Sequence, residues 1–116
     1  MWNLELDEAA ATALIVNAFL AKPLKPGEEK AVRAIARKPV GTCAEIGAVV
    51  GWPPIYWDMA FGKACGARRE ILAPLEPAVG AGKLKPIRLL ANFEHSTRRW
   101  TLKPAAVAAF QQLGYI

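Results

Sequence analysis

Apolar positions along the first 38 residues recur at helical spacing. From Asp7 to Lys22 the apolar side chains fall three or four residues apart, Asp7 is of a type that caps helix N-termini, and Pro23 ends the pattern. The next segment opens with two glutamates and closes with two basic residues, a charge order that suits the dipole of a helix. The pattern predicts helices over 8–22 and 27–38.

A capping signal at Thr42 predicts a third helix, followed by a turn. Thr42 can cap this helix, and Glu45, three residues later, supplies the acid of a capping box. Gly51 is typical of a helix end that needs a positive φ, and Pro53-Pro54 predicts a turn and the first position of another helix. We expect helices over 43–50 and 54–63, and shorter helical segments at 67–72 and 74–79 before Gly80-Ala81-Gly82.

The last third of the chain changes to the alternation typical of strands. Apolar residues alternate from Ile87 to Phe93 and again around Trp100, and His95-Ser96-Thr97 lies between the two runs. This pattern predicts a β-hairpin, after which Pro104 starts a closing helix. The hairpin is expected over 84–102 and the helix over 104–113, with Val107, Phe110 and Leu113 as its buried stripe and Gly114 as its stop. Helices followed by a hairpin and a last helix indicate an α+β fold that is mainly α.

The segment from Thr42 to Trp52 resembles the first helix and turn of a helix-turn-helix motif. Gly47 is expected to let the next helix pack closely, Gly51 to supply the positive φ of the turn, and Trp52 to anchor it. The hairpin with arginine at its tip and the Trp-Thr-Leu-Lys-Pro run resemble the wing and last helix of the winged-helix family. The resemblance implies one winged-helix domain over 1–116, with 8–22 as an extra N-terminal helix, 27–82 as the helical part, 84–102 as the wing and 104–113 as the C-terminal helix.

A second, local resemblance concerns the same turn. Glu45-Ile46-Gly47, Gly51, Pro53 and the run from Ala60 to Ala64 are similar to the helix-turn-helix stretch of the alkylguanine-DNA alkyltransferases and their alkyltransferase-like relatives. The Pro-Cys-His-Arg motif of that family, or its form with Trp in place of Cys, is absent where it should follow. The resemblance therefore implies neither alkyl transfer nor lesion binding.

Charge favours an anionic partner. The net charge is +5, and residues 1–29 hold five acids and two bases, so residues 30–116 carry +8. The winged-helix resemblance implies a helix in the DNA major groove, here 54–63, and a wing along the backbone. We therefore expect a small transcriptional regulator that binds double-stranded DNA, with contacts from Thr42, Tyr56, Lys63, Arg68, Arg69, Lys83, Lys85, Arg98 and Arg99. Asp58 would be repelled by phosphates, and the Ile55-Tyr56-Trp57 run departs from the polar residues that read bases.

An alternative hypothesis treats the domain as a protein-interaction module. Its anchor would be an aromatic helix face made of Tyr56, Trp57, Met59 and Phe61, and a fully buried Trp57 would exclude it. A homodimer is also expected, with the seam at Leu14, Ile15 and Phe19 or at Phe110, Leu113 and Tyr115, unless both stripes close a single core.

Enzymatic and metal chemistry find little support in the residues. Cys43 and Cys65 form no C-x-x-C pair, and with His95 as the one histidine no structural metal site or cofactor is expected. Glu94-His95-Ser96 are consecutive, so they cannot line up as a catalytic triad, and Gly80-Ala81-Gly82-Lys83 lacks the spacing of a phosphate loop. We expect no enzyme. The acidic N-terminus and the short apolar run at 9–21 predict a cytoplasmic protein without export or membrane insertion.

Overall fold

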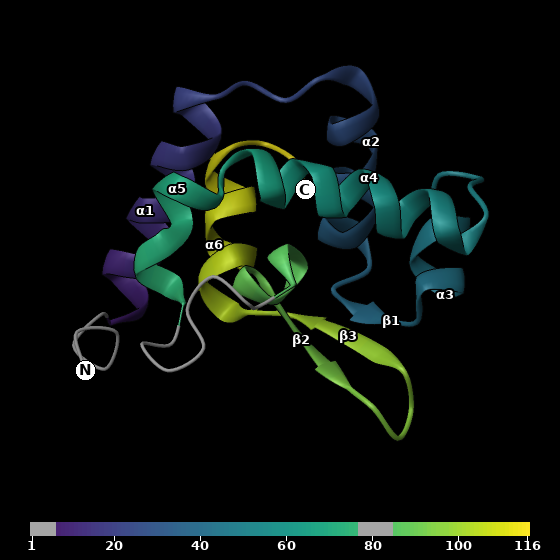
Figure 1. Cartoon of the computed structure of the whole chain (residues 1–116). Coiled ribbons are helices and arrows are strands. Elements are labelled where there is room, and N and C mark those ends of the chain that lie inside the picture. The colour runs from purple at the N-terminus through teal and green to yellow at the C-terminus, as the bar shows by residue number, and fades with distance from the viewer. Residues whose placement is uncertain (1–6, 77–84) are drawn as a thin grey trace.

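The helices of this computed structural model, which describes residues 7–76 and 85–116, begin and end close to where the sequence signals place them (Figure 1). The Asp7 carboxylate caps α1 by accepting from the Ala10 N–H at 2.7 Å. The helices are α1 Glu8–Ala21, α2 Pro26–Arg37, α3 Cys43–Ala48, α4 Pro54–Ala67, α5 Arg69–Leu72 and α6 Pro104–Gln112. Two 3₁₀ turns, η2 Ala73–Leu75 and η3 Pro86–Leu89, complete the helical elements of the described ranges.

Three short strands form one antiparallel sheet in the order β1-β3-β2. They are β1 Val40–Gly41, β2 Ala91–Glu94 and β3 Arg99–Leu102. The hairpin places Phe93 opposite Trp100, and β1 adds to its other edge with Gly41 opposite Trp100. The chain is therefore α+β and mainly α, and the strand before α3 pairs with the strand that follows the hairpin turn.

The hairpin is shorter than the sequence predicts. Residues 86–89 form η3 instead of a strand, because Pro86 has no N–H to donate and the Leu90 N–H bonds to the Ile87 carbonyl at 3.0 Å. Ile87, Leu89 and Leu90 are all buried, which a strand with alternating faces would not allow. The expectation of a strand before Ala91 is wrong, whereas residues 77–84, which hold the expected helical segment beyond 76, Lys83 and the start of the hairpin, lie outside the described residues.

The core joins the helices to the inner face of the sheet. Phe19 of α1 meets Phe110 of α6 edge to face, with ring centroids 5.4 Å apart. The two stripes considered for a dimer seam therefore pack on each other within the chain. In α6 the buried residues are Ala105, Ala106, Ala109 and Phe110, while Val107 and Leu113 are only partly buried. None of the helices in residues 7–76 and 85–116 is long and apolar enough to cross a bilayer.

Candidate nucleic-acid interface

The turn between α3 and α4 is fixed by a capping box and two glycines. The Thr42 hydroxyl accepts from the Glu45 N–H at 3.2 Å, and the Glu45 carboxylate accepts from the Thr42 N–H at 2.9 Å. Gly51 has φ 73°, as its role in the turn requires. A Cβ at Gly47 would lie 2.8 Å from the Trp52 carbonyl oxygen, so glycine allows the turn to close over α3. Capping box and turn, both predicted from sequence, are confirmed, and they set the direction in which α4 leaves.

The turn directs α4 so that its aromatic residues separate between core and surface. Trp57 and Phe61 have exposed fractions of 0%, and the Trp57 indole N–H donates to the Ala31 carbonyl at 3.1 Å. The expectation that these two aromatics form an anchor on the surface is wrong, because their spacing places them on the core side of the helix. The outward residues of α4 are Ile55, Tyr56 and Met59, with exposed fractions of 63%, 60% and 53%.

The hairpin carries the exposed arginines and is tied to the start of α3. Arg98 lies in the turn at φ 57°, a left-handed conformation that is uncommon for arginine. Arg99 points its guanidinium at Glu45, with Nη1 and Oε1 3.2 Å apart. Much of the charge of Arg99 is therefore offset, whereas Arg98 has no ion pair among the described residues.

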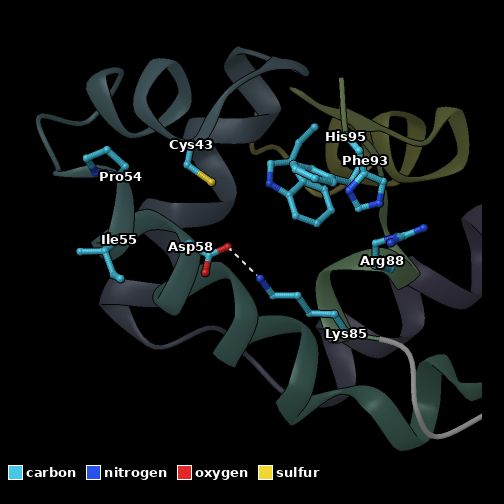
Figure 2. Close-up of a pocket in the computed structure, with 9 residues that line it drawn as sticks. Cys43, Pro54, Ile55, Asp58, Lys85, Arg88, Phe93 and His95 are labelled. Atoms are coloured by element: carbon cyan, nitrogen blue, oxygen red, sulfur yellow. Dashed lines mark hydrogen bonds and ion pairs between the residues drawn. The ribbon is translucent and has the colours of Figure 1, made fainter. Parts of the chain in front are cut away.

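A cleft of about 520 Å³ separates the start of α4 from the hairpin, and Figure 2 shows the side chains around it. Lys85 reaches across this cleft to Asp58, with Nζ and Oδ1 3.4 Å apart. Asp58, expected to repel phosphates, thus has a partner of opposite charge. The cleft is lined by Cys43, Pro54, Ile55, Asp58, Lys85, Arg88, Phe93, His95 and Trp100.

Arg68, expected to contact DNA, lies in the interior. Its side chain is 1% exposed, and its guanidinium donates to the Lys22 carbonyl at 2.6 Å and the Ala64 carbonyl at 2.7 Å. The Glu28 carboxylate, 3.5 Å away, balances its charge. The expectation is wrong because Arg68 continues the buried face of α4 and ties that helix to the segments around it.

The other predicted contact residues lie at separate places. Arg69 forms an ion pair of 2.7 Å with the buried Glu76. Lys63 is exposed on α4, away from the cleft, and Thr42 spends its hydroxyl on the helix cap. Lys85 is brought to the cleft, and Lys83 lies outside the described residues.

The two thiols are poor nucleophiles. Burial raises the pKa of Cys43, although the indole of Trp100 and the nearby Lys85 work against this shift. Cys65 is fully buried, and burial raises its pKa far more. Thiolates are therefore scarce at neutral pH at both positions. Within residues 7–76 and 85–116, no three His, Cys, Asp or Glu side chains gather closely enough to hold a metal ion.

Sequence reasoning missed three residues of the cleft. Arg88 was placed on the outer face of a strand, and Phe93 and Trp100 were assigned only as inward residues of the hairpin. The signal available was the position of Arg88 and Lys85, two cations just before an aromatic hairpin.

Comparison with models of protein families, with curated proteins and with solved structures gives no match.

Proposed function

We propose that this chain is a winged-helix domain that binds double-stranded DNA mainly through phosphate contacts from its hairpin. The element order α2-β1-α3-α4-β2-β3 with sheet order β1-β3-β2 supports this proposal, because it sets a helix and a hairpin side by side after a tight helix-helix turn. The observation that carries the proposal is the pair of cations without ion pairs, Arg88 and Arg98, beside and on the hairpin that faces α4 across the cleft.

The outer face of α4 favours shape and charge over base reading. Ile55, Tyr56 and Met59 offer one hydroxyl for hydrogen bonds to base edges, and Asp58 is held by Lys85. We therefore propose low sequence discrimination, with Tyr56 placed to contact sugars or bases and Lys63 to contact a phosphate. A small cytoplasmic regulator that needs a second determinant for its target would fit these properties.

The wing assignment is tested with Arg98→Asn. Asparagine tolerates the left-handed conformation at this position, so the substitution removes the charge and spares the turn. We expect weaker binding to a mixed-sequence duplex and a log–log salt dependence shallower by about 1, as for one lost phosphate contact. The readout is fluorescence anisotropy over a range of salt concentrations.

The matched control is Lys22→Gln at the end of α1. Lys22 donates to the Ala67 carbonyl at 3.0 Å, a bond that glutamine can also make, and α1 packs on α6 and α5. Equal salt slopes for Arg98→Asn and the unaltered chain would exclude the wing from the interface, whereas a slope changed equally by both variants would point to net charge alone.

A protein-interaction module is the second candidate function, and one observation favours it. Ile55, Tyr56 and Met59 expose apolar surface on one helix, and a second cleft of about 470 Å³, which includes Trp52, adjoins Tyr56 and Met59. This patch replaces the one that contained Trp57 and Phe61. Tyr56→Asp is expected to leave the fold intact and to abolish partner capture in a pull-down from cell extract. Unchanged capture by this variant would remove the hypothesis.

A further inference from the structure

The cleft between α4 and the hairpin has a shape that phosphate contacts do not explain. A DNA backbone needs cations on a rim, whereas this cleft is concave, mostly apolar and about 520 Å³ in volume. That volume lies within the range of about 300 to 1,000 Å³ that is common for small-molecule sites. The feature that needs an occupant is therefore the interior of the cleft.

The walls and floor of the cleft suit a flat ring. Ile55 stands on the α4 side, Phe93 and His95 on the hairpin side, and Trp100 lies between them (Figure 2). The rings of Phe93 and His95 meet edge to face at 5.0 Å, and those of Phe93 and Trp100 are tilted at 4.7 Å. Aromatic rings favour further rings in stacked or edge-to-face contact, so this lining selects an aromatic ligand.

The charges around the cleft favour one negative charge on that ring. Lys85 and Arg88 supply two cations and Asp58 one anion, which leaves a surplus of +1. Arg88 has no ion pair among the described residues, and Lys85 is half exposed with three N–H donors, so both can turn toward a ligand. A carboxylate balances this surplus, whereas a phosphate dianion would leave Asp58 facing an uncompensated charge.

We propose that the cleft is a binding site for a small aromatic carboxylate. The ring lies between Ile55 and Phe93, and the carboxylate accepts hydrogen bonds from the Arg88 guanidinium and the Lys85 ammonium. Because α4 and the hairpin form its two sides, an occupied cleft would alter the surface that we assign to DNA. The site is nevertheless defined without DNA, and its test does not depend on DNA binding.

The test uses NMR of the isotopically labelled chain titrated with 2-naphthoate. The indole N–H of Trp100 reports on the cleft, and that of Trp57, which is buried and bonded to Ala31, is an internal reference. We expect a saturable shift of the Trp100 signal and of the Phe93 and His95 amides, with the Trp57 signal unchanged. The saturated analogue decahydro-2-naphthoate tests the ring, and 2-naphthamide tests the charge; both should bind at least about tenfold more weakly.

Two variants tie the affinity to named side chains. Arg88→Gln should weaken 2-naphthoate binding by about tenfold, since a hydrogen bond to a charged group is lost. Phe93→Leu keeps apolar volume but removes the ring, and should weaken binding by about threefold to tenfold. Lys22→Gln is the control and should bind as the unaltered chain does. Arg88→Gln carries the test if Phe93→Leu, which packs on Trp100, fails to fold.

Three results would overturn the proposal. The first is the absence of any Trp100 shift at millimolar 2-naphthoate, and the second is equal binding of the saturated analogue, which would indicate a greasy crevice without preference for a ring. The third is an oligothymidylate that shifts the same signals at much lower concentration, which would assign the cleft to single-stranded nucleic acid. Failure of duplex binding alone would leave the carboxylate result standing.

Discussion

Two glycines that lie at different distances from their neighbours show how single residues set the position of α4. Gly47 faces the Trp52 carbonyl so closely that a Cβ would come within 2.8 Å of backbone, which cannot move aside as a flexible side chain can. Gly62, inside α4, has nothing nearer than 4.0 Å to such a Cβ. The first glycine is required by packing, whereas the second only costs the chain conformational entropy.

Alanine substitutions at these two glycines should have opposite effects. Gly47→Ala should destabilise the fold by about 1–3 kcal/mol, as overpacking in a tight site does. Gly62→Ala should stabilise it by about 0.5–1 kcal/mol, because alanine has the higher helix propensity. Chemical denaturation of both variants measures the difference, and a Gly47→Ala protein as stable as the unaltered chain would contradict the close approach of the turn.

The capping box at Glu45 predicts a dependence of stability on pH. The Thr42 backbone N–H, and secondarily Arg99, hold the pKa of the Glu45 carboxyl below its ordinary value of 4.5. Because the folded chain binds this proton less tightly than the unfolded chain, the contribution is complete above about pH 4.5 and is lost as the pH falls through the lower folded pKa. Thermal melting at pH 7 and pH 3 should show a smaller acid-induced drop in Tm for Glu45→Gln than for the unaltered chain. Equal drops would contradict the role of the carboxylate.

At the scale of elements, Arg68 joins α4 to the segments before and after α2. Its guanidinium bonds to the Lys22 carbonyl after α1, faces Glu28 at the start of α2, and lies 4.8 Å from the ring of Phe19. A buried guanidinium with these partners is costly to remove, because the carbonyls and the carboxylate lose their only compensation in that space.

Arg68→Ala should therefore destabilise the protein by about 3–5 kcal/mol. Lys63→Ala, one turn earlier on the exposed side of α4, should change the stability by less than about 0.5 kcal/mol. Urea denaturation compares the two variants. If Arg68→Ala were no more destabilising than Lys63→Ala, the buried position of the guanidinium would be contradicted.

The elements that sequence reasoning predicted well are those whose signals are local. Asp7 and Thr42 cap helices, and Gly51 and Gly114 take positive φ where the chain leaves a helix, so a few neighbouring residues determine each boundary. The strand expected before Ala91 failed because Leu90 is buried beside Leu89, a demand set by the core and not by the local alternation.

Whole-molecule relations account for the residues of the site that were misjudged. Arg68 follows Trp57, Phe61 and Ala64 at helical spacing, so its burial was readable from the stripe, but its charge suggested a surface position. The cleft could not be predicted, because it forms only when β1 pairs with β3 and brings residues near 43, 55, 88 and 93 together. Such long-range juxtapositions leave no local periodicity.

Duplex binding at two salt concentrations tests the central claim most directly. Fluorescence anisotropy of a labelled mixed-sequence DNA duplex is titrated with the unaltered chain in 50 and 200 mM salt. Contacts from the hairpin, the segment before it and Lys63 predict binding at low salt that weakens with a log–log slope of about −2 to −4. Absence of binding in 50 mM salt, or an affinity that does not respond to salt, would contradict the account and move the assignment to the apolar face of α4.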